Sequence, residues 1–377
     1  MKVAYYSFGG RYADNPRALH QRMLARGDVD AEHVWLAGPG HAGTFPAGTA
    51  TAALGTPQAL SALESADLVV ADNHLPAWRK RPGTTYLQTW HGTPLKRIHR
   101  DALSTQPEGE EVMARLDDDV TRWDLLLAPS AAAAVPLRAA FRFDGPVPVT
   151  GYPRNDVLSS PAAAARRAEV RAALGLEEGR TAVLYAPTWR DDDRFGDGPD
   201  FRLALDLQRF SQRLGASHAL LLRLHYLVPD ALRGVDVPGV LDVSRHPDVN
   251  DLYLAADVLV TDYSSAMFDF AITGKPIVSF VYDFEHYRDV LRGFYFDPYE
   301  IAAGPVVRGS EEVLDAVADP GALRARFAGR YARFRERFCH AEDGRAADRV
   351  LDLVLRPGTR VPAKVAPAVT ARGEGLR

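Results

Sequence analysis

The stretch Thr84-Thr85-Tyr86-Leu87-Gln88-Thr89-Trp90-His91-Gly92-Thr93-Pro94 places a histidine where a predicted strand gives way to a turn. Its first residues favour a β-strand, and Gly92 and Pro94 then stop regular pairing. His91 is therefore expected on a loop at the carboxyl end of a strand, where open α/β sheets bind ligands. An imidazole, with a pKa of roughly 6.5, suits proton transfer near neutral pH. The local sequence also allows a second interpretation, a histidine that caps a buried turn.

Outward from this stretch, short apolar runs alternate with helical stretches in both halves of the chain. The predicted strands are residues 3–7, 68–71, 84–90, 125–128, 147–150, 181–186, 219–224, 240–243, 258–261 and 277–281. The predicted helices are residues 15–25, 57–65, 110–119, 204–214, 249–255, 266–273, 311–318, 322–339 and 342–355. Short apolar strands separated by helices are typical of parallel sheets buried on both faces. The pattern predicts an α/β fold of two Rossmann-like, doubly wound sheets that face a cleft.

The length of 377 residues exceeds what one hydrophobic core usually supports, so two domains are expected. We place them at residues 1–160 and 161–340, with a boundary near residues 161–175. Residues 341–355 are expected to form a closing helix that packs on the first domain. Residues 356–377 have no hydrophobic periodicity and are predicted to be disordered.

Composition excludes several classes of protein. Lys and Arg number 45 against 49 Asp and Glu, so a net charge of −4 argues against nucleic acid as a partner. The single cysteine, Cys339, allows neither an internal disulfide nor a thiolate metal cluster, which suits a reducing cytosol. No apolar run approaches the ~18 residues of a membrane-spanning helix. Motifs of nicotinamide enzymes, P-loop proteins and zinc proteases are also missing, and we expect no metal and no cofactor.

Polar residues that suit a phosphate follow several predicted strands. Thr188 and Arg190 follow residues 181–186, and arginine offers a rigid fork of donors that matches phosphate oxygens. The alternative is a surface ion pair of Arg190 with Asp191 or Asp192. Ser264 and Ser265 follow residues 258–261 and open a helix, whose N-terminus attracts anions. An ordinary serine N-cap explains the same residues without a ligand.

Two further strand ends and one turn also carry candidate functional residues. His225 follows residues 219–224, with Arg223 two residues earlier. A core histidine is the usual interpretation there, but a second histidine at a corresponding strand end argues for function. Arg154 follows the predicted strand at 147–150, and residues 7–12 resemble a glycine-rich phosphate loop without the full dinucleotide-binding spacing.

These clusters, in this order, resemble the CDP-glycerol glycerophosphotransferases of teichoic acid synthesis. The resemblance runs from about residue 3 to residue 355. The matching motifs are residues 14–18, 90–96, 151–156, 186–191, 223–225, 261–265 and 337–344.

The resemblance implies a GT-B architecture with C-terminal helices that cross between the domains. It also implies transfer of glycerol phosphate from CDP-glycerol to a hydroxyl of a lipid-linked saccharide or growing polyol-phosphate chain, with release of CMP. By the same comparison His91 and His225 match the family's catalytic histidines. The expected donor-binding residues are Trp90, Gly92, Thr93, Arg154, Pro187, Thr188, Arg190, Arg223, Ser264, Ser265 and Asp269.

Phosphoryl transfer needs a base for the attacking hydroxyl and positive groups around the phosphates. Our hypothesis assigns His91 as the base and gives His225, Arg190 and the start of the 266–273 helix to the leaving CMP. The two histidines in exchanged roles remain an alternative. Because no acidic pair suits Mg²⁺, turnover is expected to be metal-independent or only metal-assisted.

The implied acceptor is a polyprenyl-linked saccharide, so we expect a cytoplasmic protein that is peripheral on the inner face of the cell membrane. Residues 78–81, Trp-Arg-Lys-Arg, combine an interfacial aromatic with three cations, as a lipid-surface contact would. A solvated loop is the competing interpretation of this segment.

The sequence also allows other functions. CDP-ribitol is an alternative donor, and a nucleotide-sugar glycosyltransferase or a UDP-sugar epimerase would use the same architecture. A non-catalytic scaffold is a third class, disfavoured by the presence of both histidines. A homo-oligomer is left open, as is the choice between a primase and a polymerase.

Overall fold

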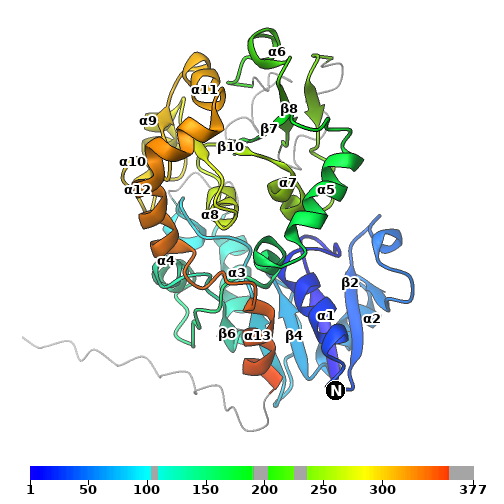
Figure 1. Cartoon of the computed structure of the whole chain (residues 1–377). Coiled ribbons are helices and arrows are strands. Elements are labelled where there is room, and N and C mark those ends of the chain that lie inside the picture. Colours follow the sequence, from blue (N-terminus) through cyan, green and yellow to red (C-terminus); the bar gives the residue numbers. More distant parts are fainter. Residues whose placement is uncertain (103–108, 189, 191–202, 225–235, 356–377) are drawn as a thin grey trace, which may run out of the picture.

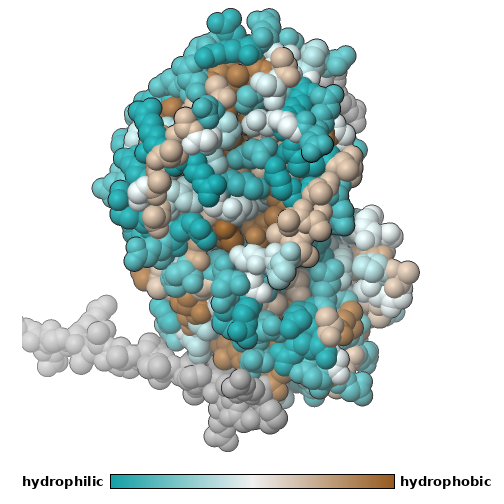
Figure 2. All heavy atoms as spheres, viewed as in Figure 1, coloured by the Kyte–Doolittle hydropathy of each residue, from teal (hydrophilic) through white to brown (hydrophobic). Residues whose placement is uncertain are grey.

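The computed structural model of the protein describes residues 1–102, 109–188, 190, 203–224 and 236–355. Two halves, each a six-stranded sheet flanked by helices, lie one above the other in Figure 1 and in the space-filling view of Figure 2. Neighbouring strands pair in parallel throughout both sheets. This arrangement confirms the two doubly wound sheets that the sequence predicts.

The two sheets share one strand order. The first runs β3-β2-β1-β4-β5-β6 and the second β12-β11-β10-β7-β8-β9, which is the Rossmann order when each half is counted from its own first strand. The first sheet contains β1 (Lys2–Tyr6), β2 (Glu32–Ala37), β3 (Thr51–Ala53), β4 (Leu68–Ala71), β5 (Thr85–Gln88) and β6 (Leu125–Leu126). The second contains β7 (Thr181–Ala186), β8 (His218–Leu222), β9 (Val240–Asp242), β10 (Val258–Thr261), β11 (Ile277–Phe280) and β12 (Val306–Val307).

Helices fill the connections between these strands. The first half has α1 (Asp14–Arg26), η1 (Ala42–Thr44), α2 (Pro57–Ser65), η2 (His99–Asp101), α3 (Glu110–Arg122), α4 (Ala131–Phe141) and η3 (Pro153–Ser159). The second has α5 (Ala163–Ala173), α6 (Leu207–Leu214), α7 (Val249–Ala255), α8 (Ala266–Ala271), α9 (Phe284–His286), η5 (Tyr287–Leu291), α10 (Pro298–Ile301) and α11 (Ser310–Val317). The last two helices are α12 (Pro320–Phe338) and α13 (Ala346–Leu355).

The predicted elements differ from the structure mainly at sheet edges. The strands predicted at 68–71, 181–186 and 258–261 have those limits in the structure, whereas β2, β3 and β12 were not predicted. The predicted strand at 147–150 is wrong, because only an isolated bridge joins Ala128 to Val149 there. Pro148 accepts a hydrogen bond from Ala128 through its carbonyl but has no N–H to donate, so no ladder forms. The expected boundary region at 161–175 contains the helix α5.

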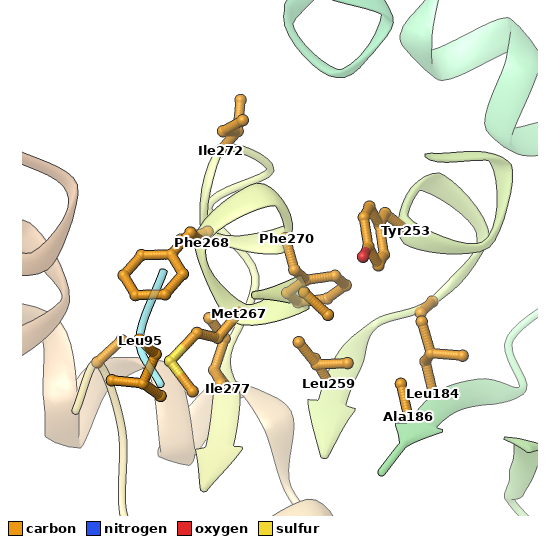
Figure 3. Close-up of a cluster of buried hydrophobic side chains, with 14 of the residues drawn as sticks. Leu95, Leu184, Ala186, Tyr253, Leu259, Met267, Phe268, Phe270, Ile272 and Ile277 are labelled. Carbon is orange, nitrogen blue, oxygen red and sulfur yellow. The ribbon is translucent and has the colours of Figure 1, made fainter. Parts of the chain in front are cut away.

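The core of the second half includes a residue from the first. Leu95 is 1% exposed and belongs to a buried cluster with Met267 and Phe268 of α8. Figure 3 shows the Leu95 side chain beside these two residues. The segment that follows His91 therefore packs into the second half.

Backbone hydrogen bonds hold that segment in place. An antiparallel bridge joins Lys96 to Phe294. Tyr295 N donates to Leu95 O over 2.8 Å, and Arg97 N donates to Gly293 O over 3.1 Å. The loop that carries His91 is thus attached to the β5 end on one side and to the second half on the other.

The chain returns to the first half after α12. Helix α13 lies beside α1, where Arg22 pairs with Asp348 at 2.7 Å and Arg26 pairs with Asp352 at 2.9 Å, and Figure 1 shows both helices in the lower half. Asp156 accepts from the first two backbone N–H groups of α13 at 2.8 Å each. The domain limits expected from the sequence stay a prediction.

Glu342 lies on the crossing segment and is buried between the halves. Its Oε1 accepts hydrogen bonds from Tyr152 N at 3.0 Å and Asn155 Nδ2 at 3.4 Å. Burial, reinforced by the nearby charge of Asp269, raises the pKa of Glu342 to about 8. The side chain is therefore mostly protonated at neutral pH.

The glycine-rich loop after β1 serves backbone packing. Gly38 N donates to Gly10 O over 2.9 Å, and a Cβ on Gly10 would lie 2.0 Å from Gly38 N. Gly10 also has a φ of +89°, which L side chains rarely adopt. The close approach of two backbones explains why glycine stands at this position.

We expect Gly10→Ala to lower the free energy of unfolding by roughly 2–4 kcal/mol, because the new methyl group meets backbone that cannot move aside. Gly40→Ala is the matched control, since Gly40 has a φ of +76° but nothing within 4 Å of the added Cβ. The control should lose about 1 kcal/mol from backbone strain alone. Equal losses for the two variants in urea denaturation would contradict the packing argument.

We also expect Glu342→Gln to change how stability depends on pH. The folded-state pKa of Glu342 lies above its ordinary value of 4.5, so the folded protein holds the proton that the unfolded chain releases. Its contribution to stability is complete below about pH 4.5 and is lost as pH rises to about 8. Relative to Glu342→Gln, the unsubstituted protein should lose roughly 2–4 kcal/mol of unfolding free energy across that range. Parallel stability curves would show that Glu342 does not hold its proton.

Candidate active site

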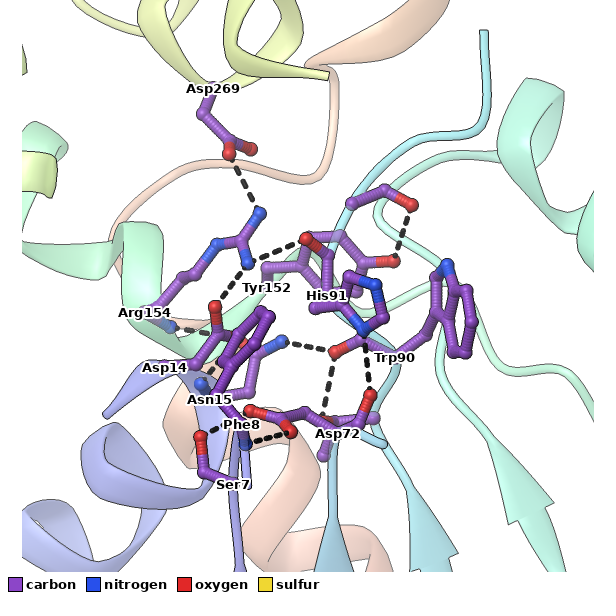
Figure 4. Close-up of polar contacts among 12 residues, drawn as sticks. Ser7, Phe8, Asp14, Asn15, Asp72, Trp90, His91, Tyr152, Arg154 and Asp269 are labelled. Atoms are coloured by element: carbon purple, nitrogen blue, oxygen red, sulfur yellow. Dashed lines mark hydrogen bonds and ion pairs between the residues drawn. The ribbon is translucent and has the colours of Figure 1, made fainter. Parts of the chain in front are cut away.

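His91 follows β5 on a turn that is held in an unusual conformation. Trp90 has a φ of +53°, in the left-handed region that few residues other than glycine adopt. Its N–H donates to Gln88 Oε1 at 2.9 Å, and its carbonyl accepts from Asn15 Nδ2 at 3.0 Å. Figure 4 shows Asn15 reaching Trp90 from α1. Side chains from two elements therefore hold the turn that presents His91.

The surroundings of His91 select one tautomer of its ring. Nδ1 lies 2.8 Å from the backbone oxygen of Asp72, which can only accept, so Nδ1 carries the proton and Nε2 keeps a lone pair. Nε2 makes no hydrogen bond to the part of the chain that the structure describes. The ring lies against Trp90, with centroids 4.1 Å apart, and against Phe8 at 5.1 Å. Burial lowers the pKa of His91 to about 4, so the imidazole is neutral at neutral pH.

The loop after β10 faces the His91 turn from the second half. A Cβ on Gly92 would lie 2.6 Å from Ser265 Oγ, so glycine permits this approach. Tyr152 donates from its hydroxyl to Gly92 O at 3.3 Å. Ser264 Oγ accepts from Ala266 N at 3.2 Å, whereas Ser265, at the N-cap of α8, makes no side-chain capping hydrogen bond. Ser264 and Ser265 are half-buried, so their hydroxyls remain within reach of solvent.

Arg154 contacts both halves and the His91 turn. Its Nη2 pairs with Asp269 of α8 at 2.7 Å, and its Nη1 pairs with Asp14 of α1 at 2.5 Å. Nη1 also donates to the His91 carbonyl at 2.8 Å, as Figure 4 shows. Nearby Asn155 donates to Asp269 at 2.9 Å. In this arrangement Arg154 and Asp269 satisfy each other and support His91, and their contact with a donor molecule stays a prediction.

Arg190 is 5% exposed and lies in a network at the end of β7. It pairs with Asp283 at 2.6 Å and with Asp262 at 2.9 Å, and it donates to Thr188 O at 2.7 Å. Its guanidinium carbon is also 5.1 Å from the ring centre of Tyr263. The alternative surface pair falls on Asp191 and Asp192, which lie outside the described residues, and the described partners of Arg190 follow β10 and β11. Arg190 therefore positions three strand-end loops.

Thr188 is the polar group of this network that lacks a partner. Its backbone N–H donates to Asp262 at 2.9 Å, whereas its hydroxyl is buried without a hydrogen bond to any described residue. Pro187 is half-buried beside it. The Thr188 hydroxyl is thus a polar group without a described partner at the carboxyl end of β7.

The structure gives less information on how the remaining predicted residues relate to the site. Thr93 is buried two residues after His91. Arg223 donates to the carbonyls of Val243 at 3.2 Å and His246 at 2.9 Å, so its guanidinium is directed at the loop after β9. His225 lies outside the described residues. The structure therefore places one of the two expected catalytic histidines.

Residues 78–81 were predicted to contact a lipid surface, and the structure contradicts this prediction for Trp78. Trp78 is 6% exposed and packs on Tyr86, with ring centroids 5.8 Å apart. Lys80 and Arg81 form ion pairs with Asp124 and Asp67. Trp78 is buried because the segment folds over the first sheet. Among the residues that the structure describes, no helix is long and apolar enough to cross a membrane.

Sequence reasoning assigned no role to three residues that shape this site. Asp72 follows β4 directly and supplies the carbonyl for His91, while its carboxylate accepts from Ser7 at 2.5 Å. The strand-end rule that selected His91 applies equally to Asp72. Asp14 and Asn15 belong to a quoted motif but carried no assigned role. In the described ranges, no group of three or more potential metal ligands is found.

Comparison with known proteins adds sequence and structural evidence. The family model of CDP-Glycerol:Poly(glycerophosphate) glycerophosphotransferase matches residues 1–356. A Bacillus subtilis (strain 168) teichoic acid poly(glycerol phosphate) polymerase is 34% identical over 368 residues, 94% of this chain and 48% of that protein. A Staphylococcus aureus (strain NCTC 8325 / PS 47) teichoic acid glycerol-phosphate transferase is 33% identical, with 94% of this chain and 92% of that protein covered. The chain thus spans about half the length of the Bacillus subtilis protein.

The solved structure of the wall teichoic acid polymerase TagF has the same architecture. It superposes with a TM-score of 0.85 and 31% sequence identity, over 94% of this chain and 88% of that one. This agreement confirms the expected GT-B-like arrangement of two Rossmann-like halves. Together with the family match over almost the whole described chain, it shows that this protein belongs to the CDP-glycerol:poly(glycerophosphate) glycerophosphotransferase family.

Proposed function

We propose that the protein transfers glycerol phosphate from CDP-glycerol to a hydroxyl of a lipid-linked saccharide or of a growing polyol-phosphate chain, with release of CMP. The observation that carries this proposal is the neutral His91, whose Nε2 lone pair is used by none of the described residues where the two halves meet. Family membership supports the donor, and one related structure is of a TagF variant soaked with CDPG.

The reaction follows from this geometry. The acceptor hydroxyl attacks the phosphorus that carries glycerol, a new O–P bond forms, and the P–O bond to CMP breaks. His91 Nε2 takes the hydroxyl proton as the bond forms. The Asp72 carbonyl accepts the hydrogen bond from Nδ1–H and so stabilises the imidazolium that results. The Thr188 hydroxyl and the Ser264 and Ser265 hydroxyls are suited to bind the phosphate oxygens, and His225 is assigned to the leaving CMP.

Donor binding should prepare His91 for its role. Burial disfavours the charged imidazolium in the free protein and so lowers the pKa of His91 to about 4. The negative charge of a bound pyrophosphate favours the imidazolium and raises the pKa again. The base therefore becomes stronger only when its substrate is present.

The same proposal covers the acceptor, the location in the cell and the ligand that each half binds. Residues 1–160 bind the acceptor and residues 161–340 hold the nucleotide, on opposite sides of the His91 turn. The protein works on a polyprenyl-linked acceptor at the inner face of the cytoplasmic membrane. The chain is proposed to act without a resident metal or cofactor.

Release of CMP from purified protein tests the proposal. CDP-glycerol, CDP-ribitol and UDP-sugars are supplied in turn with a glycerol-phosphate-primed saccharide acceptor. We expect CMP release with CDP-glycerol and only weak release with CDP-ribitol. We also expect that EDTA does not abolish turnover. A preference for CDP-ribitol would favour the ribitol alternative. Thermal stabilisation by UDP-sugars alone would favour a glycosyltransferase or epimerase, and no response to any donor would favour a scaffold.

The pH profile and a cavity variant test the role of His91. Because the base must be neutral, kcat/KM should rise with pH through about 4 and show no step near 6.5, whereas the corresponding step in kcat should lie higher. His91→Ala should lower kcat on the order of 10²–10⁴-fold, with partial rescue by added imidazole. His91→Gln, which retains the bulk of the side chain, should be equally impaired without rescue. Near-normal turnover of either variant would refute the assignment.

A further inference from the structure

Helix α12 carries an unusual concentration of positive charge. Its 19 residues include six arginines and a single acidic residue, Glu336. All six arginine side chains are exposed: Arg324, Arg326, Arg330, Arg333, Arg335 and Arg337. In Figure 1 this helix runs along the edge of the molecule, from the second half towards α4 of the first.

The spacing of the arginines divides them between two flanks of the helix. Steps of four, three and four residues place Arg326, Arg330, Arg333 and Arg337 in one row, the arginine stripe, which extends over about 16 Å. Arg324 and Arg335 lie on the opposite flank, where their side chains approach Gly274. The buried face between the flanks consists of Leu323, Phe334 and Phe338.

The stripe has no charge partner in the part of the chain that the structure describes. None of its four arginines forms an ion pair or a side-chain hydrogen bond to a described residue, although Arg326 and Arg337 lie over phenylalanine rings. Arginines of α6 differ, because Arg209 and Arg213 both pair with Glu311. Like charges on successive helical turns repel each other. The stripe therefore carries uncompensated positive charge, which attracts anions.

The stripe ends beside a groove that borders the His91 segment. The Arg337 guanidinium carbon lies 5.1 Å from the ring centre of Phe296. The neighbours of Phe296 in sequence, Tyr295 and Asp297, line a surface groove of about 320 Å³. Arg97 lines the same groove and stands six residues after His91. A chain lying along the stripe would thus be led towards the segment that carries the proposed base.

We propose that the arginine stripe binds the phosphodiester backbone of a polyanionic acceptor, a chain of polyol-phosphate units whose end is extended at the His91 site. This inference rests on the proposed function. Guanidinium groups bind phosphate oxygens through two parallel hydrogen bonds. A phosphodiester chain carries one negative charge per unit, so it matches a linear row of cations. Several weak contacts along one chain add up to useful affinity and keep the product near the site between transfers.

The form of α12 favours a polyanionic chain over an anionic lipid surface. Membrane-surface helices usually insert large apolar side chains, but none of the large apolar residues of α12 is exposed. The solvent side between its flanks carries small residues such as Ala325, Gly329 and Ala332.

A pair of double variants tests this proposal. Arg330→Gln with Arg333→Gln removes two charges from the stripe, and Arg324→Gln with Arg335→Gln removes two from the opposite flank of the same helix. Binding of an oligo(glycerol phosphate) of about ten units is measured at low salt by fluorescence anisotropy. We expect the stripe variant to bind on the order of tenfold more weakly and the flank variant to bind much like the unsubstituted protein.

Two further measurements separate the outcomes. CMP release with an acceptor that bears no phosphodiester chain should be unchanged in both variants, while products from long acceptors should be shorter with the stripe variant. Equal weakening by both variants would overturn the proposal in favour of general charge attraction. Loss of binding to phosphatidylglycerol vesicles without loss of oligomer binding would overturn it in favour of a lipid surface. Oligomer binding is measured without turnover, so its failure is distinct from a failure of the proposed function.

Discussion

The Arg154 guanidinium makes the contact on which the site depends, because it joins both halves of the protein to the turn that carries His91. It reaches Asp14 of α1, Asp269 of α8 and the His91 carbonyl at once. A buried arginine is costly unless its charge is matched, and here two carboxylates match it. Loss of either carboxylate would leave an uncompensated charge between the halves. The interaction therefore couples the relative position of the two sheets to the placement of the proposed base.

Other contacts hold the His91 ring itself for chemistry in a crowded environment. Trp90 and Phe8 flank the ring, and the Asp72 carbonyl selects the tautomer with a free Nε2. Burial favours the neutral imidazole, which is the form that a base requires. Because the Gly92 backbone touches Ser265, the base faces the loop where the second sheet reverses its strand order. In Rossmann-like sheets that position is where nucleotides bind.

Several elements of the fold and site were predictable from local pattern. β4 and β10 are buried along their whole length, and β7 is buried at every residue after Thr181, so their apolar runs stand out. His91, Thr188 and Ser264 were found because each follows such a strand. β3 and β12, of three and two residues, carry too little pattern to detect. The burial of Trp78 was not predictable, because an aromatic residue beside three cations has the same local sequence whether it is buried or meets a lipid surface.

The sequence by itself determined the class of fold, the strand-end positions of the candidate residues and the family that they resemble. These properties follow from apolar periodicity and from turn residues, which act over a few positions along the chain. Only the tertiary structure decided what each side chain does. Arg154 and Arg190 look alike in sequence as free cations, yet each is enclosed by carboxylates from elements far away in the chain. The arginines of α12 look like ordinary surface charge, yet four of them form one row that has no ion-pair partner among the described residues. Pairing, burial and tautomer depend on which distant groups folding brings within a few ångströms, and no local pattern contains that information.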